Sequence, residues 1–164
     1  MPQKEYVPEA WALEPATDSS TPKISLRNND KTSAFTFTLE AIRTNVFRTT
    51  FTSDTHLLPP HPSIPRQALE SQLSPGSATV EQTDNKKSFR LGDVSASVDW
   101  SDGAPLVTIN LKGSESALHE DVPHRSYAVN GVGVAHYSRY RRNTLHVGLG
   151  EKAAPMDLSG RRFQ

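Results

Sequence analysis

The sequence predicts an all-β fold in which two antiparallel sheets pack face to face as a β-sandwich. Apolar residues alternate with polar ones in several short stretches, and a two-residue period is typical of a half-buried strand. Turn signals rich in Asn, Asp and Gly separate these stretches. No stretch has a convincing 3.6-residue apolar period, and no internal repeat indicates a propeller or a solenoid.

A short lead-in is expected before the domain. Residues 1–21 contain only scattered apolar positions, so we expect this segment to be weakly ordered and to pack weakly or through Trp11 and Leu13. A chain of 164 residues suits a single hydrophobic core. We therefore predict one β-sandwich domain over residues 22–164.

Alternating apolar residues predict the first strands. Ile24 and Leu26 indicate a short one, and the clearest alternation in the chain follows over residues 35–41. The pattern is interrupted at residues 43–45 and resumes over residues 46–51. This interruption favours a further strand that begins after a bend or bulge.

Residues 53–86 have a different character. Repeated prolines and many Ser, Thr and Gln residues cannot sustain a helix or a central strand. We therefore predict a long Pro-rich loop within the domain.

A hairpin is predicted after this loop. Apolar residues alternate over residues 94–100 and again over residues 107–111, on either side of the turn signal at residues 101–104. Trp100 is in phase with the apolar face of its strand, so we expect its side chain in the core.

A second hairpin is predicted around Asn130-Gly131. This pair is a common two-residue hairpin turn because both residues tolerate positive φ. It is expected to join residues 127–129 to residues 132–134. The regular pattern then ends near Leu145.

The composition argues against several function classes. Lys plus Arg and Asp plus Glu number 18 each, so the zero net charge creates no field for nucleic acid or an anionic membrane. No apolar run is long enough to span a bilayer, and the polar start lacks the apolar region of a signal peptide. Cysteine and glycosylation sequons are both absent. We therefore expect a cytoplasmic protein with neither nucleic acid nor membrane among its partners.

One cluster has the residue types of a metal site. His119-Glu120-Asp121 and His124 bring imidazole and carboxylate groups close together, but their spacing matches no strong metal motif. Charged clusters that end near a proline are usually exposed connections. We interpret this segment as a solvated loop and predict no metal.

Other chemical motifs lack support in the sequence. Gly148-x-Gly150 has no third glycine, and Pro155 stands where a dinucleotide site needs a helix, so we predict no cofactor. No Gly-x-Ser-x-Gly elbow presents a serine nucleophile. The basic and aromatic residues at 139–142 and 161–163 form runs too short to indicate a nucleic-acid groove.

A family resemblance appears in the last part of the chain. Two segments resemble family 31 glycoside hydrolases: residues 145–152, which read Leu-His-Val-Gly-Leu-Gly-Glu-Lys, and residues 155–163, which read Pro-Met-Asp-Leu-Ser-Gly-Arg-Arg-Phe. In that family the corresponding segment reads Gly-Leu-Gly-Glu, then Pro-Leu-Asp, then Gly-Arg-Arg-Phe or Tyr. Phe35-x-Phe37-x-Leu39 and the segment from Asn45 to Phe51 resemble early strands of the same amino-terminal domain. The resemblance covers residues 22–164 and is greatest to fungal intracellular-type members.

This resemblance implies a galactose-mutarotase-like β-sandwich that packs against a (β/α)8 barrel of the same enzyme. In the family, the barrel supplies an aspartate nucleophile and an aspartate acid/base for a retaining mechanism. Trp100-Ser101-Asp102-Gly103 does not match the nucleophile segment, so no catalytic residue is assigned to this chain. The resemblance also implies a sandwich that is incomplete at Gln164, from which we expect self-association of the isolated chain.

The leading hypothesis is a non-catalytic amino-terminal domain or fragment of an α-glucosidase-like hydrolase of α-linked glucosides or xylosides. It would shape the mouth of the active site, and the parent enzyme would contact the carbohydrate. Glu151, Asp157 and Arg161 are the candidates at the interface with the barrel or at the active-site mouth, since charged residues near a Gly-rich turn suit a domain junction.

Two other hypotheses come from different classes. A stand-alone carbohydrate-binding β-sandwich would use exposed aromatic residues such as Trp11, Tyr137 or Tyr140 as sugar-stacking platforms. A structural interaction module would require an ordered loop at residues 53–86 with an apolar outer face.

Overall fold

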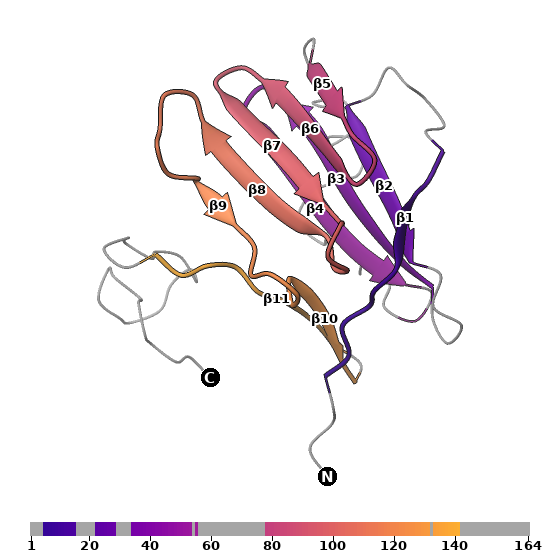
Figure 1. The fold of residues 1–164 in the computed structure, drawn as a ribbon. Helices are drawn as coiled ribbons and strands as arrows, with labels where there is room; N and C mark the ends of the chain where they lie inside the picture. Colours follow the sequence, from indigo (N-terminus) through magenta and orange to yellow (C-terminus); the bar gives the residue numbers. More distant parts are fainter. Residues whose placement is uncertain are drawn as a thin grey trace, which may run out of the picture.

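The computed structural model describes residues 5–15, 22–28, 34–53, 55, 78–131 and 133–141. All regular structure in these residues is β, as the sequence predicts (Figure 1). The strands are β1 (Trp11–Leu13), β2 (Lys23–Asn28), β3 (Phe35–Arg43), β4 (Val46–Ser53), β5 (Thr79–Gln82), β6 (Lys86–Leu91), β7 (Val94–Asp99), β8 (Leu106–Leu111), β9 (His119–Glu120), β10 (Tyr127–Asn130) and β11 (Gly133–His136).

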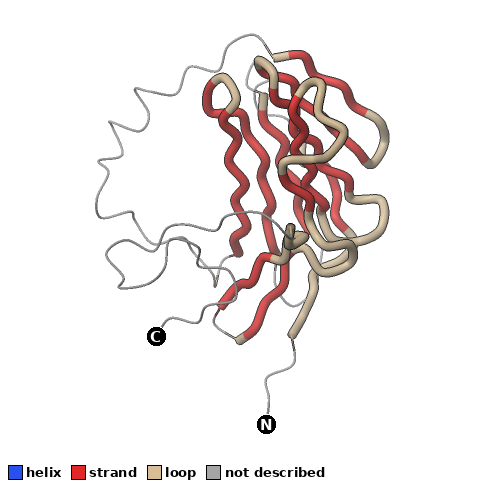
Figure 2. The backbone as a smooth tube through the Cα atoms, turned by 90° about the vertical axis from the view of Figure 1, so that its left-hand side faces the viewer, coloured by secondary structure: helices blue, strands red, loops and turns tan. Residues whose placement is uncertain are grey.

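Two antiparallel sheets form the body of the domain. One has the strand order β1-β2-β3-β4 and the other β5-β6-β7-β8-β9, so each strand pairs with its neighbours in sequence. The sheets lie as two layers across the core, and a separate hairpin, β10-β11, lies at one end of them (Figures 1 and 2). The predicted two-sheet sandwich is therefore confirmed.

The core consists of the inward faces of both sheets. In β3 every second residue from Phe35 to Ala41 is buried, which is the period that the sequence predicts. The facing sheet contributes Phe89, Ala96, Val98 and Val107 to the same cluster. Trp100 is also in this cluster and only 6% exposed, so its predicted burial is confirmed.

The β10-β11 hairpin is anchored to the core by Tyr127. The Tyr127 ring lies 5.1 Å from that of Phe37 and 5.3 Å from that of Phe51, measured between centroids. The backbones of Tyr6 and Val129 form an antiparallel bridge, which joins the hairpin to the amino-terminal segment. These contacts fix the position of β11 relative to the sandwich.

The turn between β3 and β4 contacts the other sheet. The predicted bulge is present as a register shift between Ala41 and Arg43. Asn45 adopts a φ of 61°, and its side-chain Oδ1 accepts hydrogen bonds from the backbone N–H groups of Asp93 and Val94, at 3.0 and 3.2 Å. The β3-β4 and β6-β7 turns are therefore linked.

The lead-in is more ordered than the sequence predicts. Within residues 1–21, β1 pairs with β2, and Trp11 is 8% exposed with its indole Nε1 donating to the Pro8 carbonyl at 2.9 Å. Of the two expectations for this segment, packing through Trp11 describes β1, because this large aromatic side chain reaches the core, whereas Leu13 is 37% exposed.

The prediction of a loop over residues 53–86 is wrong near the end of that range, where the structure has the strand β5. Residues 79–82 contain no proline, and β5 pairs only with β6 at the edge of its sheet. All four side chains of β5 are exposed, so no apolar alternation marks the strand in the sequence. Residues 56–77 of that loop lie outside the described residues.

The second predicted hairpin forms with a shifted turn. Asn130 pairs with Gly133, so the turn lies one residue later than predicted, and Gly131 adopts the positive φ of 63°. This register places His136 opposite Tyr127.

No helix among the described residues has the length and apolarity needed to cross a membrane.

Candidate functional site

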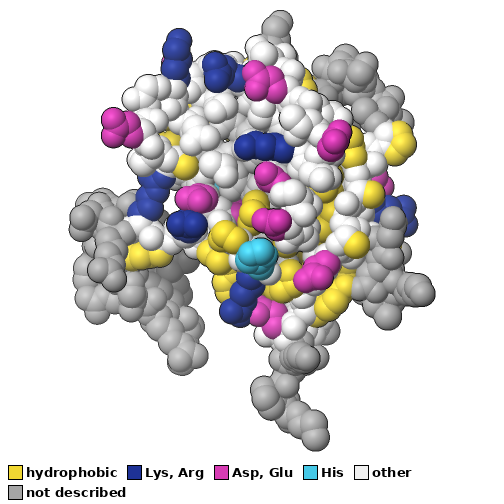
Figure 3. Space-filling view, viewed as in Figure 1, with side chains coloured by type: hydrophobic (Ala, Val, Ile, Leu, Met, Phe, Trp, Pro, Cys, Tyr) yellow, Lys and Arg dark blue, Asp and Glu magenta, His cyan; other side chains and the backbone are white. Residues whose placement is uncertain are grey.

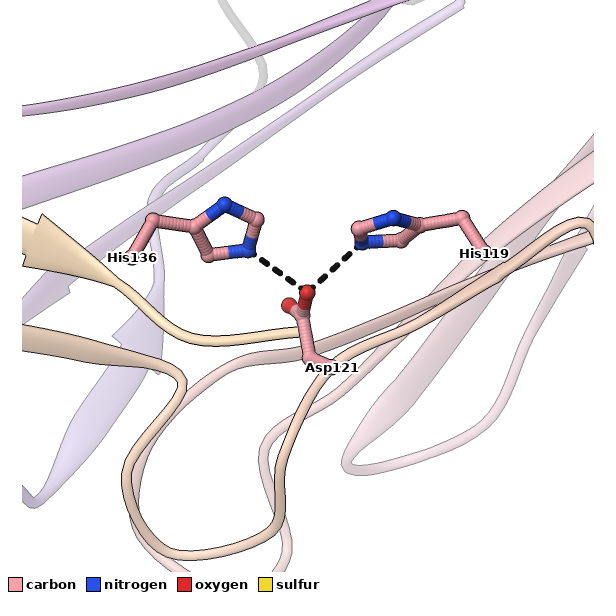
Figure 4. A group of neighbouring side chains, drawn as sticks. All are labelled: His119, Asp121 and His136. Carbon is pink, nitrogen blue, oxygen red and sulfur yellow. Dashed lines mark hydrogen bonds and ion pairs between the residues drawn. The ribbon is translucent and has the colours of Figure 1, made fainter. Parts of the chain in front are cut away.

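Three side chains from two segments meet at the hairpin: His119 and Asp121 from one, and His136 of β11 from the other (Figure 4). The Nε2 atoms of both histidines lie 2.7 Å from the same Asp121 oxygen, Oδ1. One potential ligand atom from each residue lies within 4.8 Å of the other two. The cluster therefore unites two imidazoles and one carboxylate at a single point.

The backbone explains why these residues meet. His119 and Asp121 are two positions apart in extended chain, so their side chains point to the same face. Asp121 forms an antiparallel bridge with Ser138, two residues beyond His136. Two backbone hydrogen bonds extend this pairing: the Val122 N–H donates to the Tyr137 carbonyl at 3.0 Å, and the Arg139 N–H donates to the Glu120 carbonyl at 2.8 Å.

Asp121 forms the floor of the site. Its side chain is fully buried, and the Val107 N–H of β8 donates to its other oxygen, Oδ2, at 2.9 Å. Both carboxylate oxygens therefore accept hydrogen bonds. The bond to β8 holds the carboxylate in one orientation relative to the five-stranded sheet.

The carboxyl of Asp121 is held in its ionised form. Burial by itself acts to raise its pKa, but the hydrogen bonds from His119, His136 and the Val107 N–H, with the charge of His136, outweigh that effect. The pKa of Asp121 is therefore lower than usual. The site presents a buried negative charge at neutral pH.

The two histidines open the site to solvent. Their side chains are 31% exposed at His119 and 40% exposed at His136, and the ring centroids lie 5.6 Å apart. The His136 ring stacks on Tyr127 with a centroid distance of 4.7 Å and an interplanar angle of 13°. Figure 3 shows acidic, basic and hydrophobic side chains interspersed over the face drawn there.

The prediction of a solvated loop at His119-Glu120-Asp121 is wrong for Asp121, because this residue is buried. His124, grouped with this segment by sequence proximity, is exposed in a turn at a φ of 60° and takes no part in the cluster. Glu120 pairs with Arg139 at 3.3 Å instead. His136 was not predicted as part of this cluster, because its place depends on the hairpin register and on the pairing of Asp121 with Ser138.

The proposed sugar platforms have different environments. Trp11 is buried, so it is not a platform. Tyr137 has the Arg125 guanidinium 4.4 Å from its ring centroid, and its hydroxyl donates to Glu5. Tyr140 is 61% exposed.

The interface candidates cannot be placed in this site. Glu151, Asp157 and Arg161 lie outside the described residues, as do the sequence motifs at 145–163. No family model, curated protein or solved structure matches this chain.

Proposed function

We propose that this chain is a non-catalytic amino-terminal β-sandwich domain of an α-glucosidase-like family 31 glycoside hydrolase. The observation behind this proposal is the similarity of residues 145–152 and 155–163 to the family's Gly-Leu-Gly-Glu and Gly-Arg-Arg-Phe motifs. An all-β domain with two packed antiparallel sheets is compatible with the fold that this similarity implies.

The role proposed for the domain is to shape one wall of an active site on a (β/α)8 barrel. The barrel would supply the carboxyl groups that cleave α-linked glucosides or xylosides. Glu151, Asp157 and Arg161 would contact the barrel, since interfaces between domains of one chain are commonly polar. The carbohydrate would be bound through the assembled enzyme.

Binding to a barrel tests this proposal directly. The chain would be mixed with the catalytic barrel of a family 31 α-glucosidase from which the amino-terminal domain has been removed, and the affinity measured by calorimetry. We expect saturable binding that the combined change Glu151→Gln, Asp157→Asn and Arg161→Gln weakens by about tenfold or more, equivalent to about 1.4 kcal/mol.

The matched control is Glu81→Gln, which removes one charge from the exposed edge strand β5. It should leave the affinity unchanged. Binding that is absent, or that responds equally to both sets of changes, would contradict the proposed interface.

The carbohydrate-binding alternative depends on Tyr140, the most exposed of its three aromatic candidates. Titration of the chain with maltose, followed by tryptophan fluorescence, separates the two functions. A saturable signal that Tyr140→Ala removes would favour a sugar-binding module over a domain that acts only with a barrel.

A further inference from the structure

We propose that His119, Asp121 and His136 bind a divalent transition-metal ion, with Zn²⁺ as the simplest probe. Imidazole nitrogen and carboxylate oxygen are ligands that zinc and neighbouring transition metals accept, and three protein ligands leave a further position for water or a substrate. The side chains come from two segments separated in sequence and converge on one point. This inference does not depend on the proposed function.

The two distances between a histidine nitrogen and the aspartate oxygen require only a small adjustment. Each histidine Nε2 lies 2.7 Å from Asp121 Oδ1. Metal–ligand bonds of about 2.0–2.1 Å in a tetrahedral site separate ligand atoms by roughly 3.3 Å, so the imidazoles must move outward by about half an ångström. Both rings are partly exposed, which leaves them room to turn.

The charge balance favours a cation at this point. An ionised carboxylate only accepts hydrogen bonds, so each Nε2 carries the proton in the arrangement without metal. When an ion binds Nε2, a neutral imidazole moves this proton to Nδ1, and a protonated imidazole releases it to solvent. Figure 4 shows that the second nitrogen of each ring lies away from the carboxylate.

The surrounding structure holds the central ligand in place. The Val107 N–H donates to Oδ2 of Asp121 and leaves Oδ1 toward the histidines. Hydrogen bonds of this kind to a metal ligand orient it and raise affinity for the ion. His119 is tied to β8 by strand pairing, because it lies opposite Ile109.

Calorimetry with Zn²⁺ alone tests the site. The full chain is treated with a chelator, the chelator is removed, and the chain is titrated with a zinc salt. We expect one ion per chain at the cluster. His119→Gln and His136→Gln should each weaken binding by about tenfold or more, since even loss of an outer partner of a metal ligand often has an effect of this size.

His124→Asn is the matched control. It removes an exposed imidazole close in sequence, and Asn tolerates the positive φ of 60° at that position. This variant should bind zinc as the unchanged chain does. Thermal melts without metal show whether each variant folds, and the half-exposed positions of His119 and His136 predict that both do.

Bound Co²⁺ gives an independent readout, because its visible absorption reports coordination directly. We expect this absorption in the unchanged chain and in His124→Asn, and its loss in His119→Gln. Two results would overturn the proposal: zinc affinity that is equal in all variants, which places binding at other histidines, or no zinc binding at all. In either case, the cluster is a hydrogen-bonded imidazole–carboxylate group only.

Discussion

The side chain of Trp100 illustrates how single residues hold the two sheets together. It follows β7 directly, is 6% exposed, and belongs to the same core cluster as Phe37 and Leu39 of the other sheet. We expect Trp100→Ala to lower the free energy of unfolding by about 3 to 5 kcal/mol, because it empties a large aromatic site in a packed core. Urea unfolding measures this change. A loss below about 1 kcal/mol would be typical of a surface position and would contradict the core assignment.

Tyr127 gives the domain a predicted sensitivity to alkaline pH. Burial, and then the negative charge of Asp121, raise the pKa of its hydroxyl well above 10, while the Thr49 side chain acts against that rise. The folded state favours the neutral phenol. The contribution of Tyr127 to the free energy of unfolding is therefore complete below about pH 10 and is lost as the pH rises through the folded-state pKa.

Urea midpoints measured from pH 8 upward test this expectation. The unchanged chain should lose stability above about pH 10, and Tyr127→Phe should lose less, since no proton leaves at that position. Parallel curves for the two proteins would show that the Tyr127 hydroxyl does not titrate differently in the folded state.

At the scale of elements, Asn45 joins the β3-β4 and β6-β7 turns through close contacts. Gly92 has a φ of 75°, and a Cβ added there would lie 2.5 Å from Asn45 Oδ1 and 2.8 Å from Thr44 Cγ2. Gly113 has a similar φ of 78° with nothing within 4 Å of an added Cβ. Comparing a substitution at Gly92 with one at Gly113 therefore separates the cost of backbone strain from the cost of steric contact.

We expect Gly113→Ala to cost about 1 to 2 kcal/mol, the penalty of a left-handed conformation for an L-residue. Gly92→Ala should cost more than this, since it also displaces the Asn45 side chain from the N–H groups of Asp93 and Val94. Chemical denaturation of both variants gives the comparison. Equal losses would mean that the Asn45 contact adjusts freely.

Most of the strands that could be predicted from the sequence have one buried and one exposed face. Alternation identified β2, β3, β4, β7 and β8, because burial on one side leaves a periodic trace in the chain. It could not identify β5, whose side chains are all exposed, or β9, which has only two residues. The cluster of His119, Asp121 and His136 depends on pairing between Asp121 and Ser138, and such non-local pairing has no local sequence signal.

At the scale of the whole molecule, the proposed function predicts an absence of catalysis. Retaining glycoside hydrolysis needs two carboxyl groups about 5 to 5.5 Å apart, one as nucleophile and one as acid/base. The resemblance assigns both groups to the barrel, so we expect no release of nitrophenol from nitrophenyl α-glucoside or α-xyloside above a buffer control.

The assay is repeated with Zn²⁺ present, so that a metal-dependent reaction is not overlooked. Turnover that disappears when one aspartate of this chain is replaced by asparagine would refute the non-catalytic role.

The amino-terminal segment links the start of the described chain to one of its last strands. Tyr6 and Val129 exchange backbone hydrogen bonds of 2.9 and 2.7 Å, and Glu5 contacts both Arg125 and Tyr137. At a synthesis rate of about 5 to 20 residues per second, Val129 follows Tyr6 by roughly 6 to 25 s. During translation, Glu5 and Tyr6 therefore wait without these partners while the intervening strands are made. Closure of the domain is a late event on the ribosome, and nascent chains stalled before residue 125 should leave this segment open to proteases.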